Sequence, residues 1–276
     1  MRDCSPTVRS TAWRASLRLR FAGDDGVTRL VERAHSGPLR VQKPLYPEGA
    51  AVCHAIVIHP PGGVVGGDCL AIDAAAGAGA HAFVTTPGAA KWYRANGKVS
   101  RQDVKIAAGA GAAFEWMPQE TILFDGADVV LDHDVTLEAG ARYIGSEILC
   151  FGRRASGESF SHGALRQRTQ IRSAGKLVWW EQGAIGPAAL AGRFGLGGAS
   201  VCATLIGVGA PVPATLLAAI RAIDPGLALS QMKSVIVARW LGDDSEAARH
   251  AMIKVWQSLR PHLLGCEAPL PRIWNT

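Results

Sequence analysis

Residues 51–68 read AVCHAIVIHPPGGVVGGD, an apolar run that ends in a turn rich in proline and glycine. The apolar run predicts a β-strand whose alternation places Cys53 and His59 on one face and His54 on the other. The glycines permit the positive-φ geometry of a tight turn and let another backbone approach closely. This stretch therefore predicts a strand followed by a rigid corner that positions the carboxylate of Asp68.

The same alternation of short β-prone runs with Gly, Pro, Asp or Asn recurs over residues 17–181. Regular punctuation of this kind is typical of an all-β protein. The predicted strands are residues 16–21, 51–59, 81–85, 104–107, 113–117, 129–132, 135–137, 142–149, 167–171 and 177–181. Residues 173–176 separate the last two strands and predict a hairpin loop.

Clusters of alanine and glycine occur at residues 74–80, 107–113 and 138–141, each just before a predicted strand. A recurring turn before each strand indicates stacked turns of a layered sheet. We therefore expect a mainly β protein with a single stacked, β-helix-like body over residues 17–185.

Helices are expected only in the last third, residues 186–276. Residues 213–223 predict a short helix that begins near a proline, and residues 234–240 predict one more strand. A second helix is predicted after Asp244 because apolar residues recur there at intervals of three and four. Pro261 lies inside that stripe and predicts that the helix kinks or ends near Leu259. With no polar linker, residues 1–276 are expected to form a single domain.

Composition disfavours several classes of protein. The chain is 48% hydrophobic, and its formal net charge of +6 is spread over scattered arginines with only 7% aromatic residues, which disfavours a nucleic-acid-binding module. The apolar window 205–220 is interrupted by prolines and is too short to cross a membrane. Residues 1–20 contain no signal-peptide core, so we expect a soluble cytoplasmic protein. The six cysteines, at positions 4, 53, 69, 150, 202 and 266, form no CxxC pair and predict free thiols.

Common catalytic and nucleotide-binding motifs are missing. The two Gly-Lys pairs, at residues 97–98 and 175–176, lack the Ser or Thr of a P-loop, and the glycine-rich segment 195–200 lacks the βαβ context of a dinucleotide site. Residues 157–163 do not have the spacing of a serine hydrolase. Glu115 and Glu120 leave open a β-sheet carbohydrate-active hydrolase, since such enzymes use paired carboxylates.

A tight metal site is also disfavoured, because the histidines lack the spacing of known ligand motifs. A looser arrangement remains, in which carboxylates and hydroxyls line a polar passage that a hydrated cation crosses weakly. The candidate passage residues are His59, Asp68, Thr85, Thr86, Glu147 and Glu181.

Residues 91–94 are Lys91, Trp92, Tyr93 and Arg94, two cations and two aromatics after a Pro-Gly break. Aromatic residues and arginine are typical anchors of protein interfaces. We therefore treat these four residues as candidates for docking a partner, with simple packing as the alternative.

Six blocks stand out in order along the chain, namely residues 44–49, 53–54, 59–68, 85–94, 115–122 and 152–153 with 157–160. In these blocks the chain closely resembles the urease accessory protein family UreD, called UreH in some bacteria. Met117, where the family usually has leucine, and Trp92, where another aromatic is common, are mild departures.

The resemblance implies a non-catalytic, β-rich scaffold with two helices that acts in nickel delivery in the cytoplasm. Such a scaffold binds the urease apoprotein on one side and UreF on the other, and UreF recruits the GTPase UreG, which brings nickel. It implies no tightly bound cofactor, because nickel is in transit to the urease active site. The hydrolase using Glu115 or Glu120 and a nucleic-acid-binding module remain the alternatives, and exposed docking surface predicts poor solubility of the isolated chain.

Overall fold

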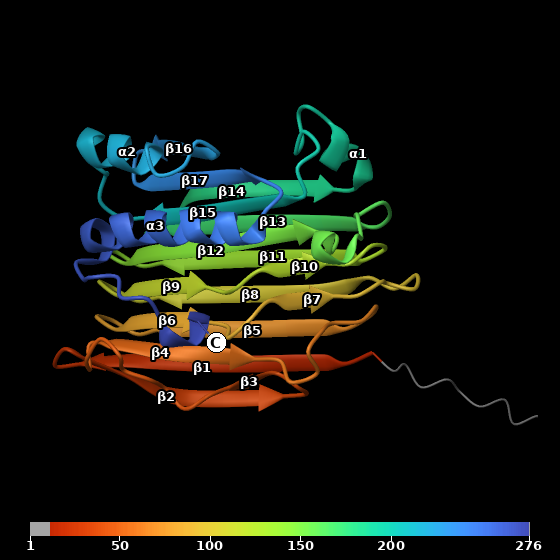
Figure 1. Cartoon of the computed structure of the whole chain (residues 1–276). Coiled ribbons are helices and arrows are strands. Elements are labelled where there is room, and N and C mark those ends of the chain that lie inside the picture. Colours follow the sequence, from red (N-terminus) through yellow and green to blue (C-terminus); the bar gives the residue numbers. More distant parts are fainter. Residues whose placement is uncertain (1–11, 276) are drawn as a thin grey trace, which may run out of the picture.

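The computed structural model describes residues 12–275, which form two β-sheets lying face to face (Figure 1). The seven strands of the first sheet are β1 (Arg14–Asp24), β2 (Val27–Ser36), β5 (Cys69–Ala76), β8 (Ser100–Ala108), β11 (Asp128–Leu137), β13 (Ala164–Ser173) and β14 (Lys176–Ile185). The ten strands of the second are β3 (Arg40–Val41), β4 (Val52–Ile58), β6 (His81–Thr85), β7 (Ala90–Trp92), β9 (Ala113–Met117), β10 (Thr121–Leu123), β12 (Arg142–Phe151), β15 (Val201–Val208), β16 (Leu227–Met232) and β17 (Val235–Gly242).

The central strands are stacked as turns of a coil. β5, β8, β11 and β13 pair in parallel in the seven-stranded sheet, and β4, β6, β9 and β12 pair in parallel in the ten-stranded sheet. Parallel neighbours need a crossover connection, and here each crossover contains a strand of the opposite sheet. The predicted layered, β-helix-like body is therefore confirmed.

Short turns rich in alanine and glycine join the strands at one end of the coil. Gly79 N donates to Ala110 O at 3.0 Å, and Gly111 N donates to the following turn at 3.1 Å. A Cβ atom at Gly109 would lie 2.8 Å from the backbone nitrogen of Ala78, so the stacked turns leave room only for glycine. The predicted stacking of these three turns is confirmed.

Longer connections lie at the opposite end of the coil. They also contact one another, since β10 pairs in parallel with both β7 and β12, and Val64 forms a bridge with Trp92. The connections are residues 59–68, 86–99, 118–127 and 152–163. The glycine-rich corner in residues 59–68 is thus the first of a stacked series.

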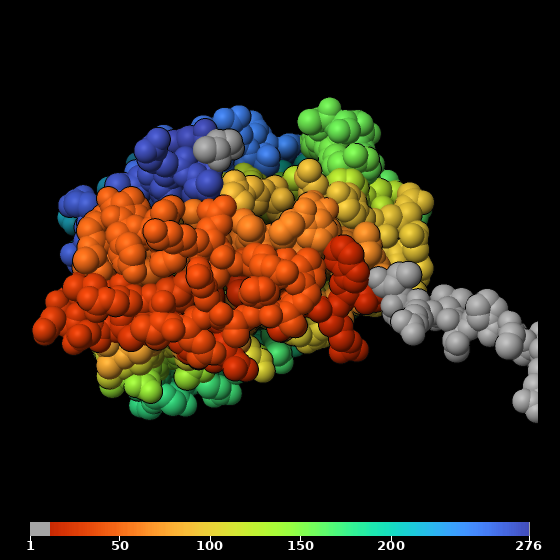
Figure 2. Space-filling model, turned by 90° about the horizontal axis from the view of Figure 1, so that it is seen from below, coloured from red at the N-terminus to blue at the C-terminus, as the bar shows by residue number. Residues whose placement is uncertain are grey.

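An apolar core fills the space between the sheets. Strand alternation directs Cys53 into this core, whereas His54 lies on the other face of β4 and stacks on Phe83 with ring centroids 4.4 Å apart. The predicted alternation around residues 51–59 is therefore confirmed. The N-terminal strands, red and orange, cover the lower end of the coil (Figure 2).

Helix α3 (Ser245–Leu264) forms a second core against the outer face of the ten-stranded sheet. Asp244 caps it by accepting a hydrogen bond from Glu246 N at 2.8 Å, as the sequence predicts. The prediction that this helix ends near Leu259 is wrong, because the helix continues to Leu264. Pro261 lies in the last turn and removes one backbone hydrogen bond there, but buried side chains hold the helix until Gly265 adopts the left-handed conformation.

The remaining helices are short. Helix α2 (Ala214–Arg221) and strand β17 confirm two predicted elements, while α1 (Pro187–Ala191) was not predicted. Two 3-10 turns cover Arg154–Ser156 and Arg272–Asn275. No helix within residues 12–275 combines the length and hydropathy needed to cross a membrane. The cysteines at 53, 69, 150, 202 and 266 are free thiols, and Cys4 lies outside the described residues.

Candidate cation passage between the sheets

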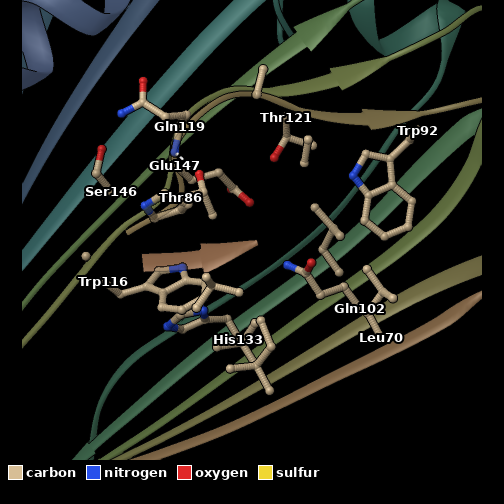
Figure 3. A pocket seen from close by; sticks show the side chains of 18 of the residues that line it. Leu70, Thr86, Trp92, Gln102, Trp116, Gln119, Thr121, His133, Ser146 and Glu147 are labelled. Carbon is tan, nitrogen blue, oxygen red and sulfur yellow. Dashed lines mark hydrogen bonds between the residues drawn. The ribbon is translucent and has the colours of Figure 1, made fainter. Parts of the chain in front are cut away.

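A cavity of about 270 Å³ lies between the two sheets on the side of the long connections (Figure 3). His59, Thr86, Trp92 and Thr121 from those connections form part of its wall. Polar side chains of the strands form much of the rest, namely Gln102, His133, Ser146, Glu147, Gln167, Thr169, Glu181 and Thr204. Apolar side chains complete the wall, so these polar side chains form a cluster within an otherwise apolar core.

A second cavity, of about 320 Å³, adjoins the first. Glu147, Gln167, Glu181 and Thr204 line both cavities, and residues 195–196 border only the second. The register explains part of this arrangement, because Thr204 lies opposite Glu147 in the pairing of β15 with β12. The two cavities thus share a pair of carboxylates, Glu147 and Glu181, and we refer to the two cavities together as the candidate path.

Glu147 is the most perturbed carboxyl group of this path. Burial raises its pKa from 4.5 to about 7, the hydrogen bond from Gln167 opposes the rise, and the negative charge of Glu181 adds to it. Gln167 Nε2 donates to Glu147 at 2.7 Å. At neutral pH this carboxyl group therefore exchanges readily between its protonated and ionised forms.

Glu181 lies on β14 and faces the same space from the opposite sheet. Its Oε1 accepts a hydrogen bond from Arg239 Nη2 at 2.7 Å. The side chain is 29% exposed, so this pair is in contact with solvent. One carboxylate of the path is thus paired with a cation at the surface, while the other is bonded only to a neutral amide.

Two histidines add neutral nitrogen atoms. Burial lowers the pKa of His133 to about 4, and its Nε2 lies 2.9 Å from the hydroxyl of Tyr143. Burial also lowers the pKa of His59, against the opposing charge of Asp68. Both rings are therefore neutral near pH 7, the form in which imidazole binds metal ions.

The wall contains polar atoms that have no partner within residues 12–275. These are His59 Nε2 and the indole nitrogen of Trp92, both of which are buried. Figure 3 shows the Trp92 nitrogen facing the hollow, across from Thr86 and Glu147. Buried polar groups are normally hydrogen-bonded, so these atoms indicate a space suited to water or a polar guest.

Four of the six predicted passage residues line the cavity, and two do not. His59, Thr86, Glu147 and Glu181 are in the wall. Asp68 instead caps the glycine corner, where it accepts hydrogen bonds from the backbone nitrogens of residues 13 and 65 at 2.8 and 3.1 Å.

Thr85 is the other exception. It lies one residue before Thr86 on β6 and therefore faces the opposite side of the sheet. Its hydroxyl accepts a hydrogen bond from Trp274 Nε1 at 2.8 Å, beneath the C-terminal segment. Thr85 and Asp68 are thus bound within the structure, away from the cavity.

The four docking candidates do not form one exposed surface. Trp92 is only 1% exposed and lines the cavity, and the half-buried Tyr93 packs edge-on against Phe124 with ring centroids 4.8 Å apart. Lys91 and Arg94 are exposed. Of the four, only these two cations present their side chains to a partner in this conformation.

The carboxylates of the hydrolase hypothesis lie outside the cavity. Glu115 is fully buried beneath α3, where Arg260 Nη2 and Trp256 Nε1 donate to it at 3.0 and 2.6 Å and His81 Nε2 lies 2.7 Å away. Glu120 faces Arg249 at 3.6 Å. A glycoside cannot reach Glu115, so the geometry gives no support to this hypothesis.

Sequence reasoning missed several polar residues of the wall. Gln167 and Thr169 occupy positions of β13 that alternate with outward-facing side chains and lie in line with the buried Leu165 and Ile171. Polar residues at inward positions of a predicted strand are a usable signal of an internal polar space. Among residues 12–275 there is no group of three or more His, Cys, Asp or Glu side chains that could hold a metal ion.

The fold defines a class, mainly β proteins built as a two-sheet coil, here with two cavities that share lining residues. The chain matches the sequence model described as UreD urease accessory protein over residues 14–275. It therefore belongs to the UreD family of urease accessory proteins, and this membership supports a role in urease maturation.

Individual relatives agree with the family match. A urease accessory protein UreD of Janthinobacterium sp. (strain Marseille) is 56% identical over 95% of this chain and 91% of its own length. The UreD of Nitrosospira multiformis is 53% identical over 95% of this chain and 98% of its own length. The UreD of Pseudomonas fluorescens is 44% identical, with 96% of each chain covered.

Proposed function

We propose that this chain is a non-catalytic scaffold for urease maturation. It binds the urease apoprotein and, together with UreF and the GTPase UreG, delivers nickel through the candidate path to the urease active site. The observation that carries the proposal is the pair of carboxylates, Glu147 and Glu181, at the junction of two cavities in a member of the UreD family. The cytoplasm, where GTP is available to UreG, is the expected compartment.

A transport path needs contacts that form and break quickly. Carboxylate oxygens, amide oxygens and neutral imidazoles all bind divalent cations. The residues of the path are spread over both sheets and therefore do not form a closed site. Glu147 has a pKa of about 7, so an arriving cation replaces a proton at little cost. The arrangement thus favours passage of nickel over its retention.

The test is complementation of a urease-positive host from which the resident gene of this family has been deleted. The wild-type chain should restore urease activity, and Glu147→Gln should lower it about tenfold, in line with the loss of one oriented metal contact. Glu32→Gln is the matched control, because Glu32 lies on the outer edge strand β2 with a weak 3.8 Å ion pair.

Two further measurements identify the step that fails. Co-purification with urease should be unchanged in Glu147→Gln, while the nickel content of the purified urease falls in parallel with its activity. Normal, nickel-loaded urease in the deletion host would overturn the proposal. Loss of the complex in Glu147→Gln would show instead that this residue supports structure or assembly.

A further inference from the structure

The side chain of Phe194 is almost fully exposed to solvent. It is 93% exposed, whereas Val31, the next most exposed large apolar side chain of the described residues, is 62% exposed. It lies in the loop between α1 and β15, with Arg193 stacked over its ring at 5.0 Å from the centroid. An isolated exposed apolar residue is ordinary, but a phenylalanine at the tip of an ordered loop calls for an explanation.

Backbone hydrogen bonds hold the loop in shape. Leu196 N donates to Ala189 O at 3.0 Å, and Gly198 N donates to Leu190 O at 2.7 Å, so the loop folds back onto α1. Gly195 fits only because it lacks a side chain, since a Cβ there would lie 1.9 Å from Ala189 O. The loop thus presents Phe194 in a fixed position, which lowers the entropic cost of binding.

The same loop borders the candidate path. Gly195 and Leu196 line the second cavity, together with Glu181 and the 42% exposed Leu241. Phe194 directly precedes Gly195 in this loop, and the same cavity is lined by Glu181 and Arg239, whose ion pair is in contact with solvent. A protein that exchanged a cation with this opening would have to dock close to Phe194.

The charge beside Phe194 indicates the chemistry of the partner. Arg193 is exposed and forms no ion pair within residues 12–275, whereas Arg239 is paired with Glu181 and Arg154 with Asp243. One cation is thus left available next to one apolar side chain. A complementary surface needs an apolar socket with a carboxylate at its rim.

We infer that Phe194 is the anchor by which a protein with such a socket docks over the second cavity. A large aromatic side chain fixed in place and flanked by arginine has the character of an interface hot spot. A second copy of this chain is a poorer occupant, because the formal charge of +6 makes self-association of the same surface unfavourable. The inference rests on the proposed function, which supplies two candidate partners.

The test measures the affinity of the purified full chain for UreF and, separately, for the urease apoprotein. Phe194→Ser should weaken binding to one of the two by about tenfold or more. Arg193→Glu should weaken the same interaction and reduce its dependence on salt. Val31→Ser, on the opposite edge strand β2, is the matched control and should leave both affinities unchanged.

Phe194→Ser should not unfold the protein, because the side chain contacts only Arg193 among the ring interactions of the described residues. An unchanged midpoint of thermal unfolding therefore accompanies the expected loss of affinity. Unchanged binding of both partners by Phe194→Ser overturns the inference while leaving the proposed function intact. Equal loss of both partners, or loss only of self-association, also overturns it.

Failure of the wild-type chain to bind either partner has a different meaning. That result overturns the proposed function, and the inference falls with it. Urease activation gives an independent readout, since Phe194→Ser should lower it in the deletion host when the variant is expressed at the wild-type level. Phe194→Trp should restore both binding and activation in part, because it returns an aromatic side chain to the same position.

Discussion

Two glutamates of the ten-stranded sheet, the fully buried Glu115 and the half-buried Glu147, show opposite behaviour. Glu115 on β9 faces α3, and Glu147 on β12 faces the cavity between the sheets. Burial raises both pKa values, but His81, Arg260 and Trp256 outweigh it at Glu115, and the net pKa there is lowered. At Glu147 no cation opposes burial, and the pKa rises to about 7. The charged partners of Glu115, which Glu147 lacks, thus account for the opposite directions of the two pKa shifts.

The contrast separates structure from function within one sheet. The carboxylate of Glu115 belongs to a saturated cluster in which Arg260 also bonds Glu48, and Glu48 lies 2.6 Å from His54. Such a cluster fixes α3 against the sheet and leaves no capacity for a further ligand. Within residues 12–275, Glu147 has one neutral donor, Gln167, and so retains acceptor capacity toward the cavity.

The largest expected effect comes from breaking the cluster. Arg260→Met removes the only arginine of residues 12–275 that contacts both Glu48 and Glu115, and it leaves these carboxylates buried without their arginine. Loss of one partner of a buried ion pair costs about 3–5 kcal/mol of stability. The measurement is urea-induced unfolding at pH 7, with Arg249→Met as the control. Arg249 on the same helix is partly exposed and 3.6 Å from its glutamate, so its loss should cost less than about 1 kcal/mol.

The pH dependence of the cluster follows from the same pKa shifts. The pKa values of Glu48 and Glu115 are lowered below 4.5 in the folded state, so their stabilising effect is complete above pH 4.5. It is lost as the pH falls through the folded values. The Arg260→Met variant should therefore lose less stability between pH 4.5 and pH 2 than the wild type. An equal loss in both proteins would show that the cluster does not control acid unfolding.

The next largest effect concerns the stacked turns that lie near the cluster. Gly109→Val places side-chain atoms against the backbone of Ala78, which cannot move without separating the turns. We expect a loss of about 3 kcal/mol in thermal or urea unfolding, the upper part of the usual range for overpacking. Gly111→Ala in the same turn is the control. Nothing lies within 4 Å of its Cβ position, so only its positive φ should cost about 1 kcal/mol.

Most of the fold could be predicted from local patterns. Strands β6 and β9 begin and end where the sequence predicts, and residues 129–137 form one strand, β11, in place of the two predicted. Strand β5 was missed because its sequence, CLAIDAAA, resembles the alanine-rich turns. Strand β15 was missed because glycine and prolines follow its apolar residues closely. Local composition does not show that these two segments are strands, because pairing with strands distant in sequence determines their conformation.

The candidate site could be predicted only in part. His59, Thr86, Glu147 and Glu181 converge because the coil stacks residues far apart in sequence, and no spacing rule expresses that contact. Glu115 and Arg260 are 145 residues apart in the sequence, so their ion pair could not be predicted from a sequence pattern either. Sequence reasoning identified the residue types of the path and missed which of two neighbours, such as residues 85 and 86, faces it.

A smaller effect tests the glycine corner at the cavity end of the coil. Asp68→Ala removes the acceptor for two backbone nitrogens, at 2.8 and 3.1 Å, while the side chain is only 2% exposed. Hydrogen bonds to a charged acceptor contribute about 2 kcal/mol, so the variant should be less stable by this amount. Asp68→Asn keeps an acceptor oxygen and should recover about half of the loss. Full stability of the alanine variant, with reduced nickel transfer, would instead place Asp68 in the path.

A gain in stability, in contrast to these losses, is expected at Glu147. The folded-state pKa of about 7 lies above the unfolded value of 4.5, so the folded protein binds this proton more tightly. Stability conferred by the protonated form is complete below pH 4.5 and is lost as the pH rises to about 7. Glu147→Gln cannot ionise, and it should equal the wild type below pH 4.5 and be more stable than the wild type at pH 8.

The same variant sharpens the contrast between the two glutamates. Glu147→Gln should combine undiminished stability with lowered urease activation, whereas Arg260→Met should lose both together. Urea titrations below pH 4.5 and at pH 8 measure the difference, with Glu32→Gln on the outer edge strand as the control that changes neither. A Glu147→Gln protein that is destabilised at pH 8 would show that the ionised carboxylate is structurally paired, as Glu115 is. A gain in stability at pH 8 would show that the ionised carboxylate of Glu147 destabilises the folded protein. A destabilising charge in the cavity is consistent with a functional role for Glu147.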